Sequence, residues 1–160
     1  MSTSLSAHIR KETLVNLVIN LVINGGLAYW LLHKHPELLA WGENGYGPDL
    51  LITGFLLAAI ISAIFIAMHR RKRAKGDLEG LAGAEQGWVR HMPANTWLAA
   101  GVFGLIGLLV AAPLLLAILW VLGIESLVPL HYAMIKGLWA GLLAALLVPP
   151  AIRLGLRQPA

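Results

Sequence analysis

Three asparagines, Asn16, Asn20 and Asn24, stand four residues apart inside a long apolar stretch near the start of the chain. Residues spaced in this way lie on one face of a helix. An unpaired amide in lipid costs on the order of several kcal/mol, so this stripe must face protein or water. Two interpretations stay open: the amides hydrogen-bond between helices or subunits, or they line a path for a solute or an ion.

Two charged residues and one hydroxyl form a second group of polar side chains. Lys136 lies inside the fourth apolar stretch of the sequence. Its ammonium either extends to the membrane surface, forms a buried ion pair with Asp49 or Glu125, or handles a solute or proton directly. Asp49 either caps a helix at the water boundary or joins such a pair, and Thr53 follows one turn deeper on the same helix face. Our candidates for a transport path are therefore Asn16, Asn20, Asn24, Asp49, Thr53 and Lys136.

Nothing in the sequence indicates an enzyme. The chain has no cysteine, which excludes disulfides, thiolate metal sites and thiol nucleophiles. His33, His35 and Glu37 lie close together. Pro36 interrupts this segment and no second group of ligands follows, so we expect no metal there. Phosphate-binding loops, nucleophile elbows and zinc-protease motifs are missing from the sequence, and we predict no catalytic residues and no cofactor.

Four long apolar stretches must position these side chains. They cover residues of about 13–32, 50–68, 97–122 and 127–151. Each reaches roughly the 18–20 residues that a helix needs to cross a membrane. The sequence thus predicts an all-α protein, a polytopic four-helix transmembrane bundle that forms one domain over residues 1–160, with a flexible loop at about 69–96. The first stretch is similar to a cleavable signal peptide, but it continues through Tyr29–Leu32, so we expect it to be retained.

The basic residues gather on one predicted side of the membrane. Ten of the twelve lysines and arginines precede the first stretch, follow the last, or lie between the second and the third. This bias predicts that both termini and the loop at 69–96 face the cytoplasm. The basic cluster directly after the second stretch should contact anionic lipid headgroups rather than nucleic acid. Its members are Arg70, Arg71, Lys72 and Arg73.

Small residues recur at close spacing in the last two apolar stretches. Gly104 and Gly107 belong to the third stretch, and Gly137, Gly141 and Ala145 belong to the fourth. Such faces let helices approach closely. We expect them to pack the third and fourth spans against each other, or otherwise to form a subunit interface.

Two further features bear on the shape of the molecule. Pro113 lies inside the third stretch and predicts a kink there. A weak internal repeat aligns Thr53-Gly54 with Lys136-Gly137. Both halves would then run in and out of the membrane in the same direction, related by an axis along the membrane normal.

Four segments taken together resemble a group of small four-helix bacterial inner-membrane proteins that are loosely labelled as permeases. These segments are Asn20–Gly25, Trp41-Gly42, Asp49–Leu57 and Lys136–Leu146, the last with Pro149 a few residues beyond it. The group has no secure activity, but the label implies transport and a multi-pass location in the bacterial inner membrane. The resemblance also points to Asn24, Asp49, Thr53 and Lys136.

The favoured interpretation is a small permease-like transporter or channel in the lipid bilayer. Four helices with one kink enclose little volume, so a conduit would form between the subunits of a homo-oligomer. The asparagine stripe would line this conduit, and Asp49 and Lys136 would form an outer charged gate. The alternative is a non-transporting scaffold or accessory subunit, which associates with its own copies or with another membrane protein through its Asn and Gly/Ala helix faces.

Overall fold

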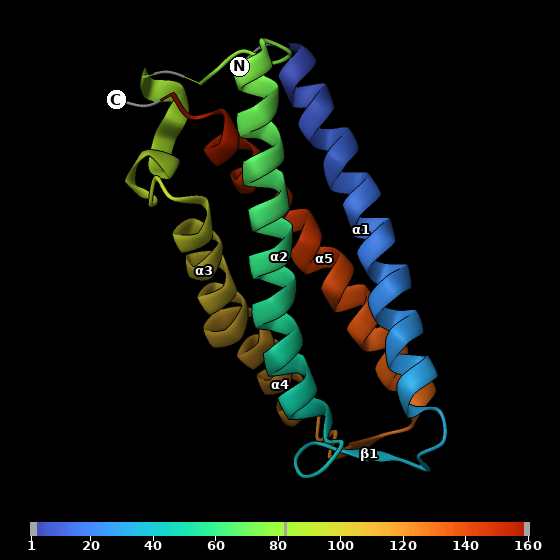
Figure 1. Cartoon of the computed structure of the whole chain (residues 1–160). Coiled ribbons are helices and arrows are strands. Elements are labelled where there is room, and N and C mark those ends of the chain that lie inside the picture. Colours follow the sequence, from blue (N-terminus) through green and yellow to red (C-terminus); the bar gives the residue numbers. More distant parts are fainter. Residues whose placement is uncertain (1–2, 82, 159–160) are drawn as a thin grey trace.

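The computed structural model describes residues 3–81 and 83–158 of the chain. Four helical stretches within them are long and apolar enough to cross a membrane, which indicates a multi-pass membrane protein. These stretches are Leu5–Leu32, Tyr46–Lys75, Thr96–Val121 and Pro129–Leu156. Both ends of the chain lie at the same end of the molecule, which we call the terminal end (Figure 1). The opposite end, which holds two short strands, is the loop end.

The elements follow one another in the order helix, strand, helix in each half of the chain. The first half contains α1 (Thr3–Leu32), β1 (Leu38–Leu39) and α2 (Tyr46–Lys75). The second half contains the 3-10 helix η1 (Gly83–His91), α3 (Thr96–Ile106), the π turn η2 (Gly107–Ala111), α4 (Ala112–Val121), β2 (Ser126–Leu127) and α5 (Pro129–Leu156). Strands β1 and β2 pair antiparallel, with Leu38 opposite Leu127, and so join the two halves at the loop end.

Three of the helices are longer than the apolar stretches that predicted them. α1 begins at Thr3 instead of near residue 13, α2 continues to Lys75, and α5 continues to Leu156. A helix need not end where its side chains become polar, because long basic side chains at its end can reach water or headgroups. At Gly76, φ is 80°, and its N–H donates to the carbonyl of Arg73, so a left-handed glycine ends α2.

The predicted flexible loop at 69–96 is shorter and more structured than expected. It contains η1, and its backbone is hydrogen-bonded to the end of α5. The Leu81 N–H donates to the Leu156 carbonyl over 2.8 Å, and the Gln158 N–H donates to the Leu81 carbonyl over 3.1 Å. At its far end, the Asn95 side chain accepts from the N–H groups of Trp97 and Leu98 and so caps α3.

α2 and α5 form the central pair of helices. α1 packs along α5, whereas α3 and η2 pack along α2. Figure 1 shows α1 and the α3–α4 pair on opposite sides of this central pair. The outer face of α1 is apolar and exposed, as expected for a surface that contacts lipid, for example at Val18 and Val22. Exposed tryptophans lie near both ends, among them Trp97 at the terminal end and Trp120 at the loop end.

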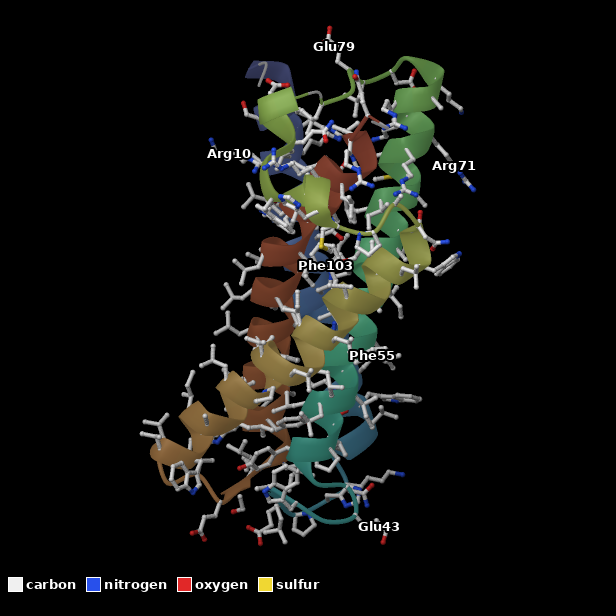
Figure 2. The ribbon with its side chains drawn as sticks, turned by 90° about the vertical axis from the view of Figure 1, so that its left-hand side faces the viewer. Arg10, Glu43, Phe55, Arg71, Glu79 and Phe103 are labelled. Atoms are coloured by element: carbon white, nitrogen blue, oxygen red, sulfur yellow. The ribbon has the colours of Figure 1, made fainter. Side chains whose placement is uncertain are left out.

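Figure 2 shows where the charged side chains lie along the molecule. The labelled Arg10, Arg71 and Glu79 lie at the terminal end and Glu43 at the loop end, while Phe55 and Phe103 lie between them. This distribution matches helices that cross an apolar layer and end in polar surroundings.

The small residues do not join the third and fourth spans, so that prediction is wrong. A Cβ added to Gly137 or Gly141 would lie 2.7 Å from the carbonyl of Leu21 or Leu17, both on α1. A Cβ at Gly107 would lie 2.0 Å from a carbonyl of α2. Within the described residues the third span makes little direct contact with α5, because α2 packs against both.

Two other predicted packing features have a different form in the structure. Gly104 lies against the ring of Phe55 of α2, and Ala145 is half-buried on α5. The expected kink at Pro113 takes the form of the π turn η2, which ends one residue before α4 begins at Ala112. π turns accommodate local breaks in the α-helical hydrogen-bond pattern. The Trp139 indole N–H of α5 donates to the Ala111 carbonyl in this turn over 3.3 Å.

Candidate functional site

The two central helices place their polar residues at matching positions. α2 begins with the residues YGPDLLITG and α5 begins with PLHYAMIKG. The fourth residues are Asp49 and Tyr132, and the eighth are Thr53 and Lys136. The ninth is glycine in both helices, at positions 54 and 137, so the sequence repeat places these residues equally far from the start of each helix.

The glycines at the ninth position make equivalent contacts in the two halves. Gly54 of α2 meets Gly107 of the third span, and Gly137 of α5 meets Gly25 of α1. In each case the central helix of one half contacts the outer helix of the other half. These equivalent contacts are the ones expected if the halves are related by an approximate two-fold axis between α2 and α5, the relation that the repeat aligned on Thr53 and Lys136 suggests.

An ion pair lies beside this axis. The Lys136 ammonium nitrogen is 2.6 Å from Oδ2 of Asp49, and the Tyr132 hydroxyl donates to the same oxygen. The Thr53 hydroxyl donates to the other carboxylate oxygen over 3.4 Å. Among the alternatives for Lys136, the structure has the ion pair with Asp49, and Glu125 is not its partner.

The two members of the pair differ in their exposure to solvent. The Lys136 side chain is 10% exposed and the Asp49 side chain 38%. Asp49 does not cap α2, because the helix begins three residues earlier and Gly45 stands at its cap position. Its place in the first turn still favours a negative charge, since the N-terminus of a helix is the positive end of the helix dipole. The carboxylate is therefore stabilised by the ammonium, the phenol and the helix.

Two tyrosines fix the site to the loop end. Tyr132 is fully buried, and its ring centroid lies 6.0 Å from that of Tyr46. The Tyr46 hydroxyl donates to the Ile124 carbonyl over 2.7 Å, in the connection before β2. The Lys136 ammonium also lies 5.9 Å from the centre of the Tyr132 ring. This arrangement places an ammonium and a phenol on one carboxylate oxygen. Ionisable groups of this kind within a span are typical of proton or ion pathways.

The asparagine stripe lies elsewhere on the molecule. Each amide donates to the carbonyl four residues before it, on Glu12, Asn16 and Asn20, over 2.9 to 3.1 Å. These bonds stay within α1, and no described hydrogen bond joins the stripe to the Asp49–Lys136 pair. The three side chains are half-buried. The candidate transport residues thus form two separate groups.

The stripe runs along one flank of the contact between α1 and α5. Each asparagine directly precedes a residue of that contact, such as Leu17 or Leu21, and so lies about 100° around the helix from it. His8 stands in the same relation to the buried Ile9. Its Nε2 lies 3.0 Å from Nε2 of His69 on α2, so this flank of α1 faces α2 at the terminal end.

Several residues of these sites are not found by the sequence argument. Tyr132 carries a direct bond to Asp49, and the available signal is its position one turn before Lys136 on the same helix face. The contact between His8 and His69 has no sequence signal, because 61 positions separate the two residues. The His69 Nδ1–H donates to the Phe65 carbonyl, so its Nε2 accepts from His8 when the ring is neutral.

The predicted headgroup cluster is divided between two faces of α2. Arg70 and Arg73 line a pocket that also includes Arg157, whereas Arg71 and Lys72 line a different surface hollow. Figure 2 shows Arg71 projecting away from the helices. In the described residues, no group of three or more histidines and carboxylates is arranged to hold a metal ion.

Comparisons with known proteins give no further information about the site. No protein-family model, curated protein sequence or solved structure matches this chain. The function must therefore be inferred from the geometry of the chain itself.

Proposed function

We propose that this protein is a small permease-like transporter or channel, with the Asp49–Lys136 pair as a charged gate at the loop end. The observation that supports this proposal is the ion pair itself, which lies beside the axis between the two halves and within the apolar spans. Charged residues in such places are rare, and they mark solute, ion or proton pathways. Transporters built from two repeats bind their substrate near the bilayer midplane at the interface between the repeats, and the pair lies toward the loop end of the corresponding interface.

The gate would work by exchange of partners. Asp49 is more exposed than Lys136, so a proton or a solute would reach the carboxylate first. Protonation of the carboxylate would remove its charge and leave the ammonium free to attract an anion. Tyr132, which donates to the carboxylate, would keep the side chain in place during this exchange.

Orientation and assembly belong to the same proposal. The excess of basic residues supports a cytoplasmic terminal end in a bacterial inner membrane, with the loop end outside. Because one chain of four spans encloses little volume, we expect the path to run between copies. Asn16, Asn20 and Asn24 would lie along it, and the partly exposed Asp49 would meet it at the loop end. Impermeant thiol labelling of Glu43→Cys and Glu79→Cys tests the orientation, since the chain has no cysteine of its own. Outside reagent should label position 43 and spare position 79.

Flux measurements in proteoliposomes test the gate. Purified protein in vesicles with a trapped pH-sensitive dye reports proton entry, and swelling in glycerol reports the passage of a small neutral solute. We expect the parent protein to pass at least one of these faster than protein-free vesicles, and Asp49→Asn to change that rate severalfold. Glu43→Gln is the matched control, because it removes one carboxylate from the exposed surface at the same end. Rates equal to those of protein-free vesicles for both probes would contradict the proposal.

A second candidate is an accessory subunit that does not transport. The observation that favours it is the half-buried asparagine stripe, whose amides donate only to oxygens of α1 itself in the described structure, three to backbone carbonyls and one also to the Asn20 side chain. Their oxygen atoms retain capacity to accept bonds from a partner helix. Under this proposal, loss of the asparagines weakens association, while Asp49→Asn alters no flux.

A further inference from the structure

A pocket of about 560 Å³ opens at the terminal end, where the connection after α2 meets the end of α5. Four arginines and two glutamines line it, together with Met92 and Ala94, and none of these described lining residues is a carboxylate. The polar lining residues are Arg70, Arg73, Arg90, Arg157, Gln86 and Gln158. They come from α2, η1 and the C-terminal segment, so the fold gathers like charges that are distant in the sequence.

Neutral groups hold two of these arginines in place. Nη1 of Arg157 donates to the carbonyls of Val89 and Met92 over 3.0 and 2.8 Å, and to that of Arg90 over 3.3 Å. Arg70 donates from Nη1 to the Thr96 hydroxyl over 2.7 Å and from Nη2 to the Ala94 carbonyl over 2.6 Å. Carbonyl and hydroxyl oxygens orient a guanidinium but carry no negative charge, so these described partners do not neutralise the two arginines.

Arg73 adds the most direct sign of an incomplete site. Its Nη1 atom is buried and has no hydrogen-bond partner among the residues that the structure describes. Unpaired buried polar groups are rare in folded proteins and call for an explanation such as a missing ion. The positive charges of Arg157 and Arg73 also act on Arg70, so the cluster repels itself when it is empty. An anion in the pocket would offset this repulsion.

We propose that this pocket binds a phosphate group. Guanidinium groups match the oxygens of phosphate with parallel hydrogen bonds, and arginine is the preferred residue for such sites. The volume exceeds that of the phosphate alone and leaves space for a group attached to it. The phosphate belongs to a lipid headgroup or to a soluble phosphate compound. The site differs from general attraction of lipid to the basic cluster, because Arg71 and Lys72 take no part in it. It is also independent of transport.

Thermal unfolding of the full chain in maltoside detergent, which carries no phosphate, tests the site. Inorganic phosphate and a short-chain phosphatidylglycerol are titrated separately, with sodium chloride at equal ionic strength as the reference. We expect a rise in melting temperature that saturates with at least one of the two ligands. Saturation with the lipid alone assigns the site to a headgroup, and saturation with both at similar concentration assigns it to any phosphate.

Two arginine variants and one control make the test specific. Arg73→Gln removes a guanidinium with an unpaired nitrogen, and Arg90→Gln removes one from the exposed 3-10 helix, so neither should disrupt the fold. Each should raise the apparent dissociation constant about tenfold, the effect of one lost charged hydrogen bond. Arg71→Gln removes the same charge from the same helix outside the pocket and should bind like the parent. No saturable stabilisation by either ligand, or an equal loss in Arg71→Gln, would overturn the proposal.

Discussion

The two halves of the chain share their packing but differ in their chemistry. Gly54 and Gly137 occupy the same position in α2 and α5 and make the same kind of contact with the outer helix of the other half. The polar residues beside them stand at matching positions but differ in type, because Asp49 in one half corresponds to Tyr132 in the other. A symmetric pair of carboxylates would repel across the axis. Because α5 has Tyr132 where α2 has Asp49, and Lys136 where α2 has Thr53, the site holds one negative and one positive charge and is neutral as a whole.

The outer helices differ as well. α1 carries the asparagine stripe, whereas the third span is apolar and is interrupted by η2 and Pro113. α1 contacts Gly137 of α5 through Gly25, and the third span contacts Gly54 of α2 through Gly107. The common frame thus positions the site, while the residues specific to each half determine what the site and its surroundings can do.

The largest effect is expected when the charge balance across the axis is broken. Lys136→Met leaves Asp49 without its counter-charge and should cost about 3 kcal/mol, the lower end for buried pairs, because Asp49 is partly exposed. Adding Asp49→Asn should recover much of this loss, and thermal melts of the single and double variants measure both. Lys34→Met is the control, because Lys34 is exposed at the same end. If Lys136→Met melts like the parent, the ion pair does not stabilise the fold, and the charged gate is lost from the proposed function.

Alanine substitutions at Gly107 and Gly137, where the two halves meet, test whether the halves are equivalent. Gly107→Ala and Gly137→Ala place a methyl group against backbone of the neighbouring helix and should each cost about 2 kcal/mol. Gly101→Ala and Gly26→Ala are matched controls, because nothing lies within 4 Å of an added Cβ there. The controls should melt at or above the parent temperature, since alanine favours a helix. A large loss of stability in one of the two variants and none in the other would argue against the two-fold relation.

A smaller difference should separate Tyr132 from Thr53. Tyr132→Phe removes a hydrogen bond to a carboxylate and should cost about 1.5 kcal/mol, with little change in packing. Thr53→Val removes a contact of 3.4 Å and should cost less than about 0.5 kcal/mol. Thermal melts of the two variants give the ranking. The reverse order would mean that the second half contributes less to the site than its geometry indicates.

The membrane spans and three of the four residues of the charged site, Asp49, Thr53 and Lys136, could be predicted from the sequence. Apolar length indicated the four helices, and the cost of burying charge selected Asp49 and Lys136. The sequence could not decide between an ion pair of these two residues and a Lys136 ammonium that extends to the membrane surface, because the depth of Lys136 depends on where α5 begins. Tyr132 was missed because an aromatic residue near the end of a span is typical of the membrane boundary and suggests no partner.

Helix neighbours were the part that the sequence predicted wrongly. The small residues of the third and fourth spans favoured direct packing between them, but α2 lies beside both spans and contacts Gly104 and Gly107. The spacing of residues within one helix shows that a face consists of small residues, but it does not show which helix packs against that face. The arginine pocket was hidden for a similar reason, since Arg90 and Arg157 approach only through the tertiary fold.

The smallest effect on folding is expected in the asparagine stripe, which distinguishes α1 from the third span. Asn20→Leu with Asn24→Leu should change the free energy of unfolding of the monomer by less than about 0.5 kcal/mol, because the lost bonds run to carbonyls of the same helix. The stripe should instead affect what lies outside the chain. If the amides bind a partner helix, the double variant should weaken association by about 0.6–2 kcal/mol in fluorescence energy transfer between labelled copies in vesicles. If they line a path, association should stay unchanged while flux in proteoliposomes changes. Association and flux both equal to the parent would remove the stripe from both functional proposals and leave the Asp49–Lys136 pair as the sole support for transport.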